Sequence, residues 1–429
     1  VNAGNSIASG GNYNTVVGDE AGTALTTGDS NVAIGFEALA TEDANGLNVA
    51  VGYRALKTLN ASGAAYNTAV GYDAGTAITT SQYNTIVGGL AADALTTGNE
   101  NTALGVGALG TETAGDRNVA VGNGALTTQN TTGGGDIYNT AVGYYAGAAV
   151  TTGIQNTLIG GLAGTNLTDA DYNVAVGVAA LDLDTKGNKS TAIGYNALST
   201  QNFTTITDTH NTAVGYDAGV SVTTGINNTF IGGLSGDAIT SGNTNTAVGY
   251  QALSADTLGD RAVAIGNTAL ASQNFTSSVD NYNVGIGNLA GASITTGIQN
   301  TIIGGLAGDA LTDADYNVAI GYQALSTDTK GNYSVAIGLG ALLNQNFTSS
   351  TDTGNVAIGR GAGNQVTTGT QNTFIGGLAG DASQGDDHNT FVGYNSGSAV
   401  NGGFRNTFIG KDSGLSMTTG DKNTILGSF

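Results

Sequence analysis

A five-residue phrase, Asn-Thr-Ala-Val-Gly or a close variant, occurs 24 times in this chain of 429 residues. Successive copies start 17 residues apart, except for one slightly longer interval, from Asn48 to Asn67, and four intervals of 21 residues. The four longest intervals end at Asn139, Asn211, Asn283 and Asn355, which makes a higher repeat of 72 residues. Self-similarity at a short fixed period indicates a solenoid, because each repeat buries its apolar face only against its neighbours. We therefore expect residues 1–429 to form one continuous repeat domain with partial coils at both ends.

Composition indicates which kind of solenoid this is. The chain contains 71 Gly and no Pro, which excludes a collagen helix, and 40% of its residues are hydrophobic, too many for a disordered chain. Gly, Thr, Asn and Val dominate the repeat, and these poor helix formers suit short strands between tight turns. The predicted fold class is all-β, a parallel β-solenoid (β-roll) of about 24 coils with 17 residues per coil.

The positions of the phrase, counted from its Asn as position 1, indicate separate roles. Position 5 is Gly in all 24 copies, which predicts a positive φ angle or a corner too crowded for a Cβ atom. Position 8 is Ala in 20 of 23 copies, so we expect a tight inward site there. Asn at position 1 can form a ladder of side-chain amides, or it can simply favour a turn. Three copies replace this Asn, by Ser190, Ala262 and Ser334, which are 72 residues apart.

Both faces of the predicted strand are apolar. Side chains alternate along a strand, so positions 2 and 4 share one face and positions 1, 3 and 5 share the other. Position 4 is Val, Ile or Leu in every copy, and position 3 is apolar with Gly285 as the only gap. One face can pack inside its own coil, whereas the other needs a second surface, which we expect to be another chain. Thr68 and Thr85 at position 2 also suit an ice-binding array, but we expect that face to be buried.

Side-chain volumes at positions 3 and 6 vary in a compensating manner. Position 6 is Gly where position 3 is large, as in the pair Phe230 and Gly233. Position 6 is often Tyr where position 3 is Ala, as in the pair Ala141 and Tyr144. Because close packing disfavours both voids and overfilling, we expect these two positions to fill one common space.

Charge and composition limit the partners of the chain. The formal net charge is −21 with 11 Lys and Arg residues, so nucleic acids and anionic membrane surfaces are poor partners. The chain has no Cys, and no apolar run approaches the ~18 residues of a membrane span, so we expect no membrane insertion. No cofactor is expected. The sequence starts and stops in mid-pattern, which predicts a processed product or a segment of a longer protein.

Several stretches of the sequence resemble known families. Asn-Val-Ala-Ile-Gly at 31–35 and Ser-Val-Ala-Ile-Gly at 334–338 resemble the head repeats of trimeric autotransporter adhesins, which are trimers of left-handed parallel β-rolls. Asn-Thr-Ala-Val-Gly-Tyr-Tyr-Ala-Gly at 139–147, followed by Thr-Thr-Gly at 151–153, is similar to repeat shafts of phage tail fibres and bacterial surface fibres. Such shafts often end in an endosialidase-type chaperone domain. The resemblance covers essentially the whole chain and implies a homotrimer of left-handed coils, intertwined or packed together, although the coils are longer than those of a typical adhesin head.

The extra residues of the long coils lie just before the next Asn and should line up along one side of the stack. Loops on a rigid scaffold often carry binding sites. Three of these loops contain Gln-Asn-Phe-Thr, so Phe203, Phe275 and Phe347 are candidate ligand-binding residues that could stack on sugars or dock a partner. Alternatively, each Phe folds back to cap its own loop, and we favour this interpretation.

The same loops contain Asn-x-Ser/Thr sequons. The candidate glycosylation sites are Asn60, Asn130, Asn202, Asn274 and Asn346. In a secreted eukaryotic protein these residues would be glycan acceptors. Asn and Thr are so frequent in this chain that chance is a serious alternative explanation.

The sequence predicts no enzyme. His210 and His388 are the only imidazoles and lie in different coils, and no Ser-His-Asp set or metal-ligand cluster has suitable spacing. Asp73 and Asp217 occupy equivalent positions, so we expect an outward acidic row and not a catalytic pair. The calcium-binding Gly-Gly-x-Gly-x-Asp repeat is missing, so no metal site is expected.

Three hypotheses for function follow. The first is a structural shaft of an extracellular fibre, in a phage tail fibre or a cell-surface appendage, that attaches to a host or surface through its loops. The second is a self-assembling extracellular filament whose subunits stack head to tail. The third is a trimeric adhesin that binds a cell-surface glycan or protein receptor. All three place the chain outside the cell, on a cell surface or in a virion.

Overall fold

The computed structural model describes residues 2–428, which form β-strands and turns without a helix. They divide into two units, one ending at Asn211 and the other starting at Thr212, and each unit is described by itself. Each unit is a parallel β-solenoid in which one three-residue strand, made by positions 2 to 4 of the phrase, marks each coil. The first unit has 11 of these strands and the second has 13, so about 24 coils are present in the described residues.

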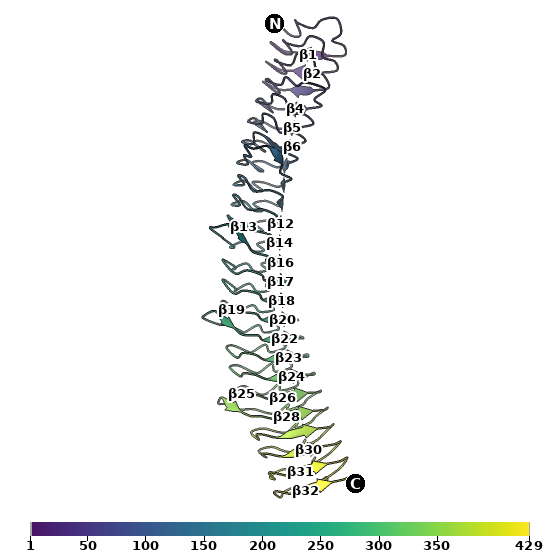
Figure 1. Ribbon diagram of the computed structural model, residues 1–429, viewed down its shortest axis with the longest axis vertical. Coiled ribbons are helices and arrows are strands. Elements are labelled where there is room, and N and C mark those ends of the chain that lie inside the picture. Colours follow the sequence, from purple (N-terminus) through teal and green to yellow (C-terminus); the bar gives the residue numbers. More distant parts are fainter. Residues whose placement is uncertain (1, 429) are drawn as a thin grey trace. The chain divides into compact units, whose positions relative to one another are not determined.

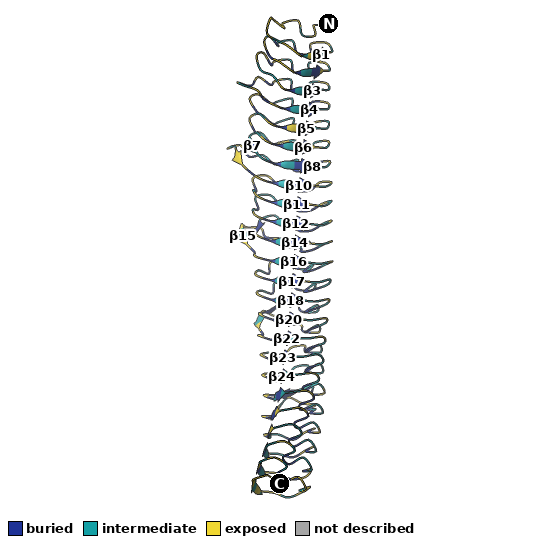
Figure 2. Cartoon of the chain, turned by 90° about the vertical axis from the view of Figure 1, so that its right-hand side faces the viewer, coloured by how far each residue is buried: buried dark blue, intermediate teal, exposed yellow. Residues whose placement is uncertain are grey.

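The strands of the first unit pair in parallel with their neighbours in the coil before and after. Thr140 pairs with Thr157 and Val142 with Ile159, so each residue lies beside its equivalent in the next coil. The strands are β1 (Thr15–Val17), β2 (Val32–Ile34), β3 (Val49–Val51), β4 (Thr68–Val70), β5 (Thr85–Val87), β6 (Thr102–Leu104), β8 (Val119–Val121), β10 (Thr140–Val142), β11 (Thr157–Ile159), β12 (Val174–Val176) and β14 (Thr191–Ile193). Figure 2 shows this stack from β1 to β14.

The second unit repeats the same arrangement, and Figure 1 shows its strands stacked in sequence order. Thr229 pairs with Thr246 and Ile231 with Val248. The strands are β16 (Thr212–Val214), β17 (Thr229–Ile231), β18 (Thr246–Val248), β20 (Val263–Ile265), β22 (Val284–Ile286), β23 (Thr301–Ile303), β24 (Val318–Ile320), β26 (Val335–Ile337), β28 (Val356–Ile358), β29 (Thr373–Ile375), β30 (Thr390–Val392), β31 (Thr407–Ile409) and β32 (Thr424–Leu426). The predicted all-β class, parallel pairing and coil length are confirmed.

The Gly at position 5 is required for two reasons, as the sequence predicted. Gly143 has a φ of 145°, which L-residues with a side chain rarely adopt. A Cβ atom on Gly143 would lie 2.3 Å from the carbonyl oxygen of Gly160, the equivalent residue of the next coil. The chain therefore turns each corner against the corner of its neighbour, and only a residue without a side chain fits there.

The Asn residues at position 1 form a ladder, although its bonds are mostly to the main chain. The Oδ1 atom of Asn139 accepts a hydrogen bond from the backbone N–H of Asn156 (2.8 Å). The Nδ2 atom of Asn156 donates to the carbonyl oxygen of Ala170 (2.8 Å), and its contact with Asn139 Oδ1 is longer (3.3 Å). Each buried amide thus joins one coil to the next and closes the turn ahead of it, which a simple turn preference does not explain.

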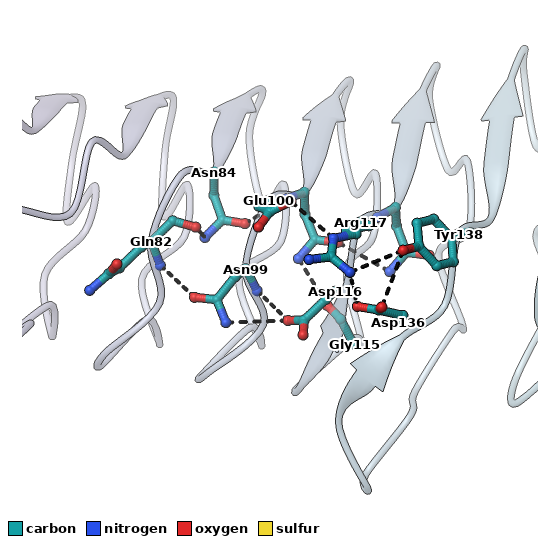
Figure 3. Close-up of polar contacts among 11 residues, drawn as sticks. Gln82, Asn84, Asn99, Glu100, Gly115, Asp116, Arg117, Asp136 and Tyr138 are labelled. Atoms are coloured by element: carbon teal, nitrogen blue, oxygen red, sulfur yellow. Dashed lines mark hydrogen bonds and ion pairs between the residues drawn. The ribbon is translucent and has the colours of Figure 1, made fainter.

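A second ladder, at position 16, was not predicted. The backbone N–H of Gln82 donates to Asn99 Oδ1 (2.9 Å), and the backbone N–H of Asn99 donates to Asp116 Oδ1 (2.6 Å). Figure 3 shows these bonds running from coil to coil. Asn and Asp suit this position because the Oδ1 atom of either side chain can accept a hydrogen bond from the backbone N–H of the preceding coil.

The predicted sharing of space by positions 3 and 6 is wrong. Position 3 points into the coil, where Phe230 is fully buried, whereas Tyr216 at position 6 is 58% exposed. The side chains at positions 3 and 6 point in different directions. The corner at position 5 turns the chain, so position 6 faces outward while position 3 faces the interior. On the outside, Gly233 at position 6 instead leaves room for the ring of Tyr250 in the next coil, 3.6 Å from where a Cβ would be.

Position 9 is the residue that shares the interior with position 3. Every coil with Phe, Leu or Ile at position 3 has Gly or Ala at position 9, wherever that position is present, and every coil with Leu at position 9 has Ala at position 3. A Cβ on Gly236 would lie 2.4 Å from the ring of Phe230. In the next coil the arrangement is reversed, with Ala247 at position 3 and Leu253 at position 9 fully buried.

We predict that moving the large side chain from position 3 to position 9 preserves the fold of this coil. Phe230→Ala alone leaves a cavity and should destabilise by about 3–5 kcal/mol. Gly236→Leu alone should also destabilise, because the new side chain overlaps the ring of Phe230. The double variant copies the neighbouring coil, in which Leu253 already has a positive φ of 55°, so it should recover more than half of the loss. Urea unfolding of the four proteins measures this coupling, and additive losses in the double variant would contradict it.

Candidate functional site in the inserted loops and on the exposed strand face

The loops of the four longest coils are each accompanied by a second, two-residue parallel pair. These pairs are β7 (Gly115–Asp116) with β9 (Gly135–Asp136), β13 (Gly187–Asn188) with β15 (Thr207–Asp208), β19 (Gly259–Asp260) with β21 (Val279–Asp280), and β25 (Gly331–Asn332) with β27 (Thr351–Asp352). In the first unit β7 and β15 project from one side (Figure 2), and in the second unit β19 and β25 do the same (Figure 1). Within each unit, the loops therefore lie in a row, as expected.

A buried carboxylate precedes each inserted loop, and sequence analysis missed this feature. Position 12 is usually an aliphatic core residue, such as Ile78 or Leu95, which are fully buried. In the coil before each long coil, position 12 is acidic and equally buried. These residues are Glu42, Glu112, Asp184, Asp256 and Asp328. The available signal was an acid at an aliphatic position, followed in four of the five cases by Gln at the same position of the next coil.

The buried carboxylates hold the start of the loop. Asp256 Oδ1 accepts hydrogen bonds from the backbone N–H groups of Gly259 and Phe275, both at 3.1 Å. Asp256 Oδ2 accepts a hydrogen bond from Gln273 Nε2 at 2.6 Å. The arrangement recurs at Asp184 and Asp328. A buried charge is tolerated only when it is hydrogen-bonded in this way, so these carboxylates fix where each loop leaves the coil.

The Gln of each of the four longest coils links the carboxylate to the Asn ladder. Gln201 Oε1 accepts from Asn211 Nδ2 (2.9 Å), while Gln201 Nε2 donates to Asp184 Oδ2 (2.5 Å) and Ser190 Oγ (2.8 Å). Ser190, which stands in place of the Asn at position 1, is thus held by the Gln amide. Gln345 donates to Ser334 Oγ in the same manner.

The phenylalanines of the loops are not exposed stacking platforms. Phe203, Phe275 and Phe347 are 7%, 5% and 7% exposed. A Cβ on Gly259 would lie 2.8 Å from the ring of Phe275, so this ring packs on the coil before its own. The alternative of exposed rings does not fit this burial, because the backbone N–H of each Phe is held by the buried carboxylate and its side chain turns inward. The interpretation that each ring caps its loop agrees with this burial.

The sequon residues lie at the start of the loops. Asn60, Asn202 and Asn274 are exposed, and Asn130 and Asn346 are half-buried. The Oδ1 atom of Asn274 accepts from Thr257 Oγ1 (3.1 Å), and the backbone N–H of Asn274 donates to the carbonyl oxygen of Thr295 (2.9 Å). Glycosylation of these five residues stays a prediction.

A cationic residue ties the outer side of three loops to the preceding coil. Arg117 Nε pairs with Glu100 Oε2 (3.0 Å), and its Nη1 pairs with Asp136 and donates to Tyr138 Oη (3.0 Å), as Figure 3 shows. The hydrogen bond to Glu100, with that to Tyr138, raises the pKa of the Arg117 guanidinium. Lys189 with Asp208 (2.5 Å) and Arg261 with Asp280 (2.8 Å) repeat this contact.

The outward strand face carries a continuous column of aliphatic residues at position 4. Leu104 is 45% exposed in the first unit and Ile231 is 40% exposed in the second. The pattern of burial is the same in nearly every strand, with position 3 buried and positions 2 and 4 half-buried or exposed. The expectation that this face is buried is wrong for the single chain, because positions 1 and 3 fill the interior of the coil.

Aromatic rings stand beside this aliphatic column at position 6. Phe36, Tyr53 and Tyr72 stack along the axis with centroids 5.4 and 5.1 Å apart. In these coils the aliphatic column and the ring stack lie side by side on the outer surface. Elsewhere position 6 is also Gly, Asn or Val, so the aromatic stack is interrupted while the aliphatic column continues.

The expected outward row of Asp73 and Asp217 is not present, because Asp73 is buried and Asp217 is half-buried. Asp73 is 9% exposed, and Arg54 Nε lies 3.6 Å from its Oδ1 atom. Burial raises the pKa of Asp93 in the next coil, and the nearby Asp73 carboxylate raises it further. Asp237 is affected in the same way by burial and by Asp217. These residues form carboxylate pairs between neighbouring coils because positions 7 and 10 face each other.

Neither metal-binding groups, nor membrane-spanning helices, nor known protein families assign a function to the described chain. Residues 2–428 contain no group of three or more His, Asp or Glu side chains arranged to hold a metal ion. Nowhere in the described chain is there a helix with the length and apolar character to cross a bilayer. A scan of protein-family models and a search of curated proteins both give no match.

We predict opposite pH responses for two of the buried carboxylates. Burial raises the pKa of Glu42 above its ordinary value of 4.5, so its ionised form destabilises the fold and acidification should tighten this loop. Burial by itself would also raise the pKa of Glu112. Hydrogen bonds from Gln129 and from backbone N–H groups outweigh the effect of burial and lower this pKa below 4.5. Stability from Glu112 is therefore present above pH 4.5 and is lost as the pH falls through the lowered pKa.

Hydrogen–deuterium exchange from pH 7 to pH 3 measures this difference. The amides of Gly115 and Thr131, which donate to Glu112, should lose protection at the acidic end. The amides of Asn45 and Ala61, which donate to Glu42, should keep or gain protection. A parallel loss of protection at both sites would contradict the assignment.

Proposed function

We propose that this chain forms the structural shaft of an extracellular fibre, in a phage tail fibre or a cell-surface appendage. In this proposal three copies associate through the strand face, with left-handed coils that are intertwined or packed side by side. The inserted loops then lie outside and are available for attachment to a host or surface. The proposal includes no catalytic role and no membrane insertion.

The observation that carries the proposal is the exposed aliphatic column at position 4. The chain has a net charge of −21, yet every described copy of position 4 is Val, Ile or Leu. An exposed apolar column that continues over many coils is the kind of surface that marks an interaction site. A second and third copy of the same chain would cover this surface, since identical columns with the same axial spacing match coil by coil.

The backbone arrangement supports a mechanical role. Neighbouring coils are joined by a parallel strand pair, in most coils by an Asn amide, and in many by a second Asn or Asp side chain. Contacts of this kind are local and recur along the chain, so stability adds along the stack. The resemblance to fibre shafts and adhesin heads supports the trimer and the extracellular location.

Two alternatives use other surfaces. In a head-to-tail filament, end coils pair with another subunit, and β32 pairs only with β31 among the described strands. In a trimeric adhesin, the loop rows bind a cell-surface glycan or protein, and the regular anchoring of the loops by buried carboxylates favours a fixed presentation. Filaments of unlimited length would indicate the first alternative. Saturable binding that is lost when the loops are shortened to the common coil length would indicate the second.

Charges introduced into the aliphatic column are predicted to separate the chains. Val248→Glu combined with Ile265→Glu places two carboxylates at neighbouring position 4 sites that point out of the coil. We expect the native protein to be a trimer and the variant to associate at least tenfold more weakly, measured by mass photometry and sedimentation equilibrium. Thr276→Glu combined with Ser277→Glu adds the same charge to an exposed loop and should leave the trimer intact.

Two results would overturn the proposal. The first is a native chain that is a monodisperse monomer at micromolar concentration, because no second chain would then cover the aliphatic column. Equal weakening by the loop variant would mean that net charge, and not the strand face, controls association.

A further inference from the structure

The repeat departs from its usual residues around a pocket in the second unit. The pocket has a volume of about 320 Å³ and is lined by polar and apolar side chains from coils between residues 323 and 381. It lies at positions 6, 7, 10 and 11 of neighbouring coils, away from the interior of the solenoid. The equivalent residues of the preceding higher repeat, in the same unit, give a direct comparison.

Two glycines open the pocket. Gly340 and Gly361 occupy position 7 of successive coils, where the equivalent residues are Thr268 and Leu289. A Cβ on Gly340 would meet only Asn364 Nδ2, at 3.4 Å, within 4 Å of it. In the first unit, Gly124 is also at position 7, but the ring of Tyr145 covers it, 2.7 Å from where its Cβ would lie.

Longer polar side chains surround the space that these glycines leave. Arg360 replaces Asn288, and Asn364 and Gln365 replace Ala292 and Ser293. Asn364 Nδ2 donates to the carbonyl oxygen of Gly340 (3.2 Å), and Gln365 Nε2 donates to Asn364 Oδ1 (3.0 Å). These hydrogen bonds fix both amides at the wall of the pocket before any ligand arrives.

Arg360 itself is available for a ligand. Most of the cations of this chain pair with a carboxylate, as Arg117 and Arg261 do. Within the described residues Arg360 makes no ion pair, and it is exposed at the edge of the pocket. Its guanidinium, which carries five donors, is therefore not engaged by a carboxylate of the chain.

Asp381 contributes a carboxylate to the lining of the pocket. Its Oδ1 atom is buried and has no hydrogen-bond partner in the part of the chain described, and burial raises the pKa of this carboxyl. Asp237 and Asp309, at equivalent positions, also leave one oxygen without a partner. Asp381 differs because it lines an open pocket, where it is the one carboxylate among the lining residues.

We propose that this pocket binds one pyranose ring of a neutral glycan. Sugar hydroxyl groups both donate and accept, so they suit a carboxylate, a guanidinium and two amides in one site. Leu339, Leu343 and Leu378 supply apolar surface for the C–H face of the ring. The volume lies at the lower end of the about 300–1,000 Å³ typical of ligand sites, which suits a single ring. One guanidinium and one carboxylate line the pocket, so their opposite charges offset each other. We therefore expect no preference for a charged ligand.

The test uses the full chain and simple sugars. Saturation-transfer NMR and titration with the methyl glycosides of glucose, galactose and mannose should detect binding of at least one of them. Gly361→Leu fills the pocket, and the fold accepts Leu there because Leu289 has a φ of 58° at the equivalent position. We expect this variant to lose at least tenfold in affinity without a change in circular dichroism or melting temperature.

Control variants and ligands separate this site from unspecific binding. Asn288→Arg adds the same charge at the equivalent, filled position and should leave sugar binding unchanged. Asp381→Asn should weaken binding, because the amide supplies one acceptor oxygen in place of two. Absence of binding by every neutral glycoside, unchanged binding in Gly361→Leu, or tenfold tighter binding of methyl glucuronide would each overturn the proposal.

Discussion

The register that sets each coil on its equivalent in the next is the constraint on which the rest of the structure depends. Hydrogen bonds between strands, such as those of Thr140 and Thr157, set this register only when the corners also match. The corner is a Gly whose Cβ position is taken by the next corner's carbonyl oxygen. A side chain at any one of these corners would push two coils apart and break the ladder of amides beside it.

Within this frame, positions 3 and 9 together have room for one large side chain per coil in most cases, beside the buried residue at position 12. Phe230 fills that room from position 3, and Leu253 fills it from position 9 in the next coil. Coils with small residues at both positions depend on their neighbours. A Cβ on Gly75 would already approach Leu56 in the coil before and Ile86 in the coil after, to within 3.2 Å. Volume is therefore balanced along the stack as well as within a coil, as close packing requires.

The insertions change the loop without changing the register. A buried carboxylate such as Asp256 replaces an aliphatic core residue and collects the backbone N–H groups at both ends of the extra turn. Gln273 then connects that carboxylate to the Asn ladder. Because the donors and acceptors of this cluster are paired with one another, the polar group does not weaken the core as an unsatisfied one would.

The sequence by itself determined the class of fold, the length of the coil, the Gly corner and the Ala at position 8, because each of these is repeated too often to have another cause. It also located the inserted loops. It did not determine which strand face is inside, since both faces are apolar and alternation alone is symmetrical. Only the tertiary structure showed that Phe275 is buried, that Asp256 is a core residue and that Gly340 and Gly361 meet Arg360 and Asp381 at one pocket. These contacts join residues of different coils, and their geometry depends on how each corner turns the chain in space.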